Sequence, residues 1–147
     1  MSNVLHLIRR AVSSLRNHPV DQQSRDTASA VLLPVEFEMW SRMQNRDQRH
    51  SLAVLARFDA LLPSAGRAER AAALLHDVGK SASNLGWLMR VIATVVGPRT
   101  RRFAEYADHE AIGARMLSGV SDELTVLLVS GRAVGHVADA LRAADEI

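Results

Sequence analysis

A histidine, an aspartate, a glycine and a lysine follow directly after an apolar stretch in the middle of the chain. Residues 71–75 are Ala-Ala-Ala-Leu-Leu, which predicts the buried face of a helix, and His76-Asp77-Val78-Gly79-Lys80 comes next. Imidazole and carboxylate groups side by side suit a divalent metal ion. Gly79 suits the left-handed conformation in which many helices end, and Lys80 would then lie beside the site, as a phosphate contact or as a partner of Asp77.

Two further residues are candidates for the same site. His50 precedes His76 by 26 residues, near the start of a helix with an apolar face, and Asp145 ends the segment Ala-Leu-Arg-Ala-Ala-Asp on another expected helix. Two imidazoles and two carboxylates from three helices would leave coordination positions for water or substrate, as in a catalytic rather than a structural metal site. The set accepts Fe, Mn, Mg, Co, Ni or Zn, so the identity of the divalent ion stays open.

In this order, His50, His76-Asp77 and Asp145 resemble the H…HD…D signature of the HD-domain metal-dependent phosphohydrolase superfamily. The segment Leu-Leu-His-Asp-Val-Gly-Lys is similar to the most typical form of that signature, and the resemblance covers about residues 35–147. It implies an all-helical fold, these four residues as metal ligands, and hydrolysis of phosphomonoesters or phosphodiesters, often nucleotides. Asp77 would also orient the attacking water, and Lys80 would contact the substrate.

Two more histidines, His109 and His136, are candidates for binding a second metal or for contacting a phosphate. The segment 108–114, Asp-His-Glu-Ala-Ile-Gly-Ala, resembles the one in which some members of the superfamily place a further histidine, which implies that role for His109; the alternative is a surface or capping residue. The next helix ends in Val129-Ser130-Gly131 and offers no histidine, and His136 comes only nine residues before Asp145. This departure favours the alternative function, a catalytically degenerate HD-fold module that binds a nucleotide or a protein partner.

Three arginines are candidates for phosphate binding, because the guanidinium fork matches phosphate oxygens. Arg46 and Arg49 flank His50, and Arg101 lies in a basic cluster after Gly97-Pro98. The alternative for each is a solvated helix face.

Helical spacing of apolar residues dominates the chain, and the alternation typical of strands is almost absent, which predicts an all-α fold. We expect one helical bundle domain over residues 34–147, preceded by an N-terminal helix and linker over 1–33, with a loop or linker at 18–34 because His18-Pro19 and many polar residues occur there. The expected helices cover about 3–17, 35–44, 46–62, 67–77, 84–96, 99–106, 108–118, 122–130 and 134–146.

Composition limits the remaining choices. The 147 residues include no cysteine, which excludes disulfides and thiolate metal ligands and fits a reducing, cytoplasmic location. The sequence contains no run of eighteen apolar residues, so it predicts no helix that spans a membrane. A formal charge of +2 is too small to favour nucleic acid as a partner. The resemblance implies a small phosphorylated substrate, a nucleotide above all. The oligomeric state stays open, with a homo-oligomer among the alternatives.

Overall fold

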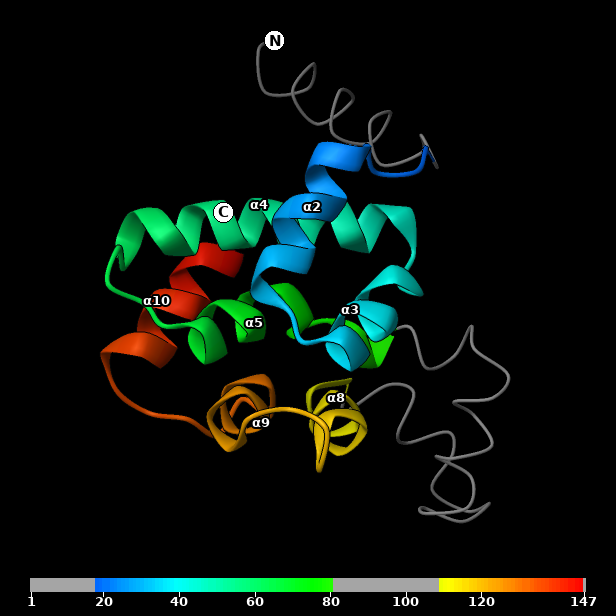
Figure 1. The fold of residues 1–147 in the computed structure, drawn as a ribbon. Coiled ribbons are helices and arrows are strands. Elements are labelled where there is room, and N and C mark those ends of the chain that lie inside the picture. The colour runs from blue at the N-terminus through cyan, green and yellow to red at the C-terminus, as the bar shows by residue number, and fades with distance from the viewer. Residues whose placement is uncertain (1–17, 81–108, 147) are drawn as a thin grey trace, which may run out of the picture.

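Every regular element in the described part of the protein is helical, and all but one short 3₁₀ turn are α-helices. The computed structural model describes residues 18–80 and 109–146, and its helices form a bundle (Figure 1). The helices are α2 (Gln22–Val31), α3 (Pro34–Ser41), α4 (Asn45–Leu61), α5 (Arg67–Leu75), α8 (His109–Leu117), α9 (Glu123–Val129) and α10 (His136–Asp145). The predicted all-α fold class is confirmed.

Helix α5 lies at the centre of the core. Its last five residues, 71–75, are completely buried, and α5 packs against α4 on one side and α9 on the other. Three consecutive alanines keep the side chains short, which lets neighbouring helices approach closely. The apolar run before His76 is therefore a buried helix, as its composition predicts, although the α-helix ends at Leu75 and a short 3₁₀ turn follows at 78–80.

The expectation of a loop or linker at 18–34 is wrong, because α2 occupies residues 22–31. Asp21 caps this helix by accepting a hydrogen bond from the Ser24 backbone N–H at 2.8 Å. Ala28, Val31 and Leu32 are buried and belong to the main hydrophobic core. In Figure 1, α2 crosses α4 and leads directly into α3. A narrow apolar stripe of three residues anchors an otherwise polar helix, and the many polar residues concealed it in the sequence.

Helix α3 and the start of α4 are tied together by buried polar contacts. The Gln48 side-chain amide donates to the backbone carbonyls of Trp40, Ser41 and Met43 at 3.0–3.1 Å, which satisfies acceptors at the end of α3. Trp40 is fully buried, and its Nε1 donates to Ser51 Oγ at 2.9 Å. These bonds fix the first turns of α4, where His50 lies.

The last three helices agree with the sequence prediction to within two residues at each end. Breaks after α8 and α9 fall at Gly119 and Gly131, both with positive φ values of 82° and 71°. The helices expected at 3–17, 84–96 and 99–106 lie outside the described residues. Within residues 18–80 and 109–146, no helix has the length and apolar character needed to cross a membrane.

Candidate metal centre

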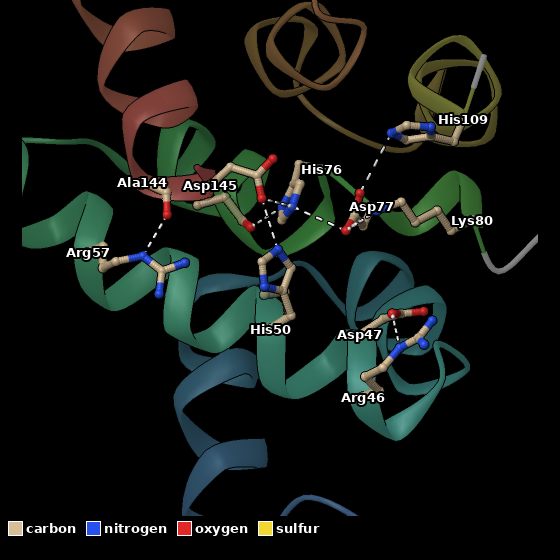
Figure 2. A network of polar contacts seen from close by, with 12 residues as sticks. Arg46, Asp47, His50, Arg57, His76, Asp77, Lys80, His109, Ala144 and Asp145 are labelled. Carbon is tan, nitrogen blue, oxygen red and sulfur yellow. Dashed lines mark hydrogen bonds and ion pairs between the residues drawn. The ribbon is translucent and has the colours of Figure 1, made fainter. Parts of the chain in front are cut away.

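Four side chains from three parts of the chain converge where α4, α5 and α10 meet: Asp77 is buried, His76 is mostly buried, and His50 and Asp145 are partly exposed. His50 comes from α4, His76 and Asp77 follow α5, and Asp145 ends α10; Figure 2 shows these side chains pointing toward one another. His50 Nε2 donates to Asp145 Oδ1 at 2.9 Å. The His50 and His76 rings meet edge to face, with centroids 5.5 Å apart. The structure thus brings together all four residues that the sequence predicts as metal ligands.

His76 is held so that one ring nitrogen faces the two carboxylates. Its Nδ1 donates to the Ala73 carbonyl at 2.8 Å, which in the neutral ring leaves the lone pair on Nε2. Nε2 lies 3.2 Å from Asp145 Oδ1 and 3.4 Å from Asp77 Oδ2, yet it is buried and aligned for a hydrogen bond with neither. A backbone carbonyl on the outer nitrogen is a common arrangement for a metal-binding histidine.

The electrostatics of this cluster favour a positive charge at its centre. Burial opposes the charged form of His76, but the carboxylates of Asp145 and Asp77 outweigh it and raise the pKa of His76 to about 10. Burial likewise opposes ionisation of Asp77, but His76 and Lys80 hold its pKa well below the usual range. His76, with a smaller contribution from His50, lowers the pKa of Asp145 to about 2 against the effect of burial. In the metal-free protein, a proton on His76 supplies this positive charge.

The spacing of the donor atoms fits a single ion with little adjustment. One ligand atom from each of His50, His76 and Asp77 lies within 4.8 Å of the others. Two ligands on opposite sides of one ion are about 4.2 Å apart, since each bond is about 2.1 Å. Asp145 stands outside this closest set of three, although it contacts both imidazoles. It would enter the coordination sphere once an ion replaced the protons between these groups.

Lys80 and His109 lie on either side of Asp77. Lys80 Nζ donates to Asp77 Oδ2 at 2.8 Å, and His109 Nε2 is 3.8 Å from Asp77 Oδ1. His109 opens α8 and is about half exposed, so it faces open space at the edge of the cluster (Figure 2). The expected position of Lys80 beside Asp77 is confirmed.

Gly79 has a different role from the one its type suggested. It does not adopt a positive φ, so the expectation of a left-handed helix exit is wrong. Instead it lies against the backbone of α8: a Cβ at this position would be 1.9 Å from the His109 carbonyl oxygen and 2.8 Å from the Gly113 nitrogen. The missing side chain is what lets α8 bring His109 beside Asp77.

Three other predicted residues lie apart from the cluster or outside the described residues. His136 is exposed at the start of α10, roughly 14 Å along the helix axis from Asp145 at 1.5 Å per residue. It is therefore not brought to the site, because it sits at the opposite end of the helix that delivers Asp145. Arg46 lies beside Asp47 with Nε 3.4 Å from Oδ1. Arg101 lies outside the described residues.

Arg49 is also directed elsewhere, because its guanidinium donates to the His18 backbone carbonyl. The hydrogen bonds described for these two arginines thus lead to Asp47 and to His18.

Arg57 also supports the site, although no motif marks it in the sequence. Its Nε donates to the Ala144 carbonyl at 2.6 Å, one residue before Asp145. The last carbonyls of a helix lack partners within the helix, so Arg57 satisfies one of them and holds the final turn of α10 in place. The available signal was spacing: Arg57 follows His50 by seven residues, two turns later on the same face of α4.

A cavity of about 400 Å³ opens beside the cluster, between the 76–80 segment and helices α8, α9 and α10. Its volume is typical of sites for small molecules. The polar residues that line it include five from the cluster and its edge, namely His76, Asp77, Lys80, His109 and Asp145. The candidate metal centre is thus open to a ligand on this side.

Comparison with known proteins adds no relative: no family model, no curated protein and no solved structure matches the chain.

Proposed function

We propose that this protein is a metal-dependent phosphohydrolase of the HD-domain type. The observation that carries the proposal is the buried, unbonded Nε2 of His76, which faces two carboxylates whose pKa values are lowered, with His50 alongside. Two carboxylates around Nε2 favour a positive charge at this position, which a proton on His76 supplies in the metal-free protein and a divalent ion would supply in its place. This arrangement, together with the order of the residues in the H…HD…D signature, supports a divalent ion as the resident group.

In this proposal His50, His76, Asp77 and Asp145 hold the ion. When bound, such an ion lowers the pKa of a coordinated water and polarises a phosphoryl oxygen. Asp77 orients the attacking water by accepting a hydrogen bond from it. Its carboxylate is held for this role by Lys80 at Oδ2 and lies near His109 at Oδ1. Lys80 and His109 neutralise charge that develops on the phosphate. The substrate is a phosphate ester of a small organic molecule, with nucleotides as the first class to test.

The direct test combines activity with a second measurement. The full-length protein is assayed with Mn, Fe, Mg, Co or Ni against nucleotides and generic phosphoesters, and its melting temperature is recorded with each ion. Ligand binding to the native state raises apparent stability, so an activating ion also raises the melting temperature. Asp77→Asn should remove both effects. The control Asp26→Asn, at an exposed position on α2, should preserve them. Absence of hydrolysis with every ion, or hydrolysis unchanged in Asp77→Asn, would refute the proposal.

The alternative is a non-catalytic module that binds a nucleotide or a protein partner. It is favoured by α9, whose contribution to the cavity wall is Leu128 and Val129, with no side chain able to bind a metal. Metal-free protein as purified, with a melting temperature that ignores every added ion, would support this alternative.

A further inference from the structure

The cavity beside the candidate metal centre has two chemically distinct halves. Toward the 76–80 segment it presents the groups that bind metal and phosphate in the proposed function. Toward α9 and α10 its wall is aliphatic and comes from five residues: Leu128, Val129, Ala133, Ala138 and Leu141. All five are less than 10% exposed and belong to the main hydrophobic core; Ala133 lies in the connection between α9 and α10.

The charged groups near the aliphatic half do not favour a second anionic group on the ligand. Arg142 lines the cavity, but its guanidinium is engaged: Nη1 is 3.0 Å from Asp139 Oδ1, and Nη2 donates to the Ala133 carbonyl at 3.0 Å. Glu110 also lines the cavity, with its carboxylate against Gly131, where a Cβ would lie 2.3 Å from Oε2. A carboxylate at this position repels phosphate and directs it toward Lys80.

The size of the cavity limits the ligand as well. A volume of about 400 Å³ is at the lower end of the range for small-molecule sites, roughly 300–1,000 Å³. One phosphate at the metal end leaves room for a compact group against α9 and α10. A polyphosphate or a large second polar group would have to place charge against Glu110 or against aliphatic side chains.

We propose that the aliphatic wall of α9 and α10 selects the organic group of the substrate. The inference rests on the proposed function and makes it specific: the substrate is an ester with a single phosphate and a compact, uncharged, apolar alkyl or aryl group. The phosphate lies at the His76–Asp77–Lys80 end, and the organic group lies against Ala138 and Leu141. Hydrolysis transfers the phosphoryl group to water and releases the alcohol with the proton that the water lost.

The test is a series of phosphomonoesters whose alcohols leave about equally well: methyl, butyl and hexyl phosphate, with glycerol 3-phosphate as the polar comparison. We expect kcat/KM to rise about threefold to fourfold for each methylene that the wall covers, and glycerol 3-phosphate to be at least tenfold poorer than butyl phosphate. Binding of methyl- and hexylphosphonate in the presence of Mn²⁺, measured by calorimetry, should show the same order without turnover.

Variants with a larger side chain in the aliphatic wall test whether this wall causes the preference for longer alkyl groups. Ala138→Leu should lower the ratio of kcat/KM for hexyl over methyl phosphate at least tenfold, and Ala133→Leu serves as a second filling variant if the first does not fold. Ala143→Leu is the matched control, because Ala143 is exposed on the same helix and does not line the cavity; the ratio should stay unchanged. Hydrolysis of the whole series at one rate would overturn this inference and leave the proposed function standing. Hydrolysis of none of the esters, with no phosphonate bound, would overturn this inference, and the proposed function would fall only if nucleotides and generic phosphoesters were not hydrolysed either.

Discussion

The Nε2 atom of His50 donates to Oδ1 of Asp145 at 2.9 Å, joining residues that are 95 positions apart in the chain. The same carboxylate oxygen is 3.2 Å from His76 Nε2, so one atom of α10 faces imidazoles from two other segments. This triangle is the part of the candidate site that depends most on the packing of α10.

Asp145→Asn should weaken metal binding about tenfold to a hundredfold, the range typical when a group that supports a metal site is lost. The variant should also lower the pKa of His76 from about 10, because it removes one of the two carboxylates that favour the charged ring. Metal titration by calorimetry and NMR titration of the His76 ring measure the two effects. Glu146→Gln, at the exposed neighbouring residue, should change neither. An unchanged affinity would remove Asp145 from the ligand set.

Metal-free protein should lose stability as the pH rises from neutrality toward 10. The pKa of His76 is about 10 when folded and about 6.5 when unfolded, so the folded state holds the extra proton in this interval. The stabilisation is complete below pH 6.5 and is lost as the pH rises through 10, with a slope of at most about 1.4 kcal/mol per pH unit. Urea unfolding at a series of pH values tests this, and a flat profile between pH 7 and 10 would contradict it.

Metal affinity should change with pH in the opposite direction. An ion that binds Nε2 of His76 displaces the proton held there, so the apparent affinity should rise about tenfold per pH unit up to pH 10 if one proton is released. Calorimetry in two buffers with different ionisation enthalpies counts the protons directly. Binding without proton release would place the ion elsewhere.

Arg57→Met should lower the free energy of unfolding and weaken metal binding together. The bond from Arg57 Nε to the Ala144 carbonyl involves a charged donor, and such bonds contribute about 1.5–3 kcal/mol. Because the bond holds the turn that carries Asp145, metal affinity should fall as well, and Arg57→Lys should restore part of it. Arg132→Met is the control at an exposed arginine. Loss of stability with unchanged metal affinity would show that Arg57 does not position Asp145.

Gly79→Ala should move α8 away from the site. The added Cβ would be 1.9 Å from the His109 carbonyl oxygen, which is backbone and cannot rotate away, so the expected loss is about 1–3 kcal/mol of stability. His109 would withdraw from Asp77, which a shift in the His109 ring resonances would report. Gly66→Ala is the control, because the nearest atom to its Cβ is 4.0 Å away and its φ is −81°.

The features that follow from local chemistry could be predicted from the sequence. The apolar run before His76 gave a buried helix, and the breaks near Gly119 and Gly131 separated α8, α9 and α10. His50 and Asp145 were recognised through residue order, and folding brought them together. In each case the residue type or the spacing alone is enough to predict the structural feature.

The features that depend on tertiary packing could not be predicted in the same way. Helix α2 is mostly polar and is held by a few buried apolar residues and the Asp21 cap, so its composition resembled a linker. The position of Gly79 after an apolar helix favours a left-handed turn, whereas its close contact with the backbone of α8 explains why glycine is there. Arg57 has no motif, because its partner is a backbone carbonyl 87 residues away. His136 shows the converse, a suitable residue type at the wrong end of its helix.

The hydrogen bond between Trp40 and Ser51 gives the candidate site an optical reporter. Ser51 directly follows His50, and the indole that binds it is fully buried. Indole emission depends on the polarity and the hydrogen bonds around the ring, so a shift in the first turns of α4 changes its wavelength or intensity. The chain contains one other tryptophan, Trp87, so the emission of Trp40 is measured alone in a Trp87→Phe variant. In that variant, binding of an ion at His50 should change the Trp40 emission in real time, without label or substrate.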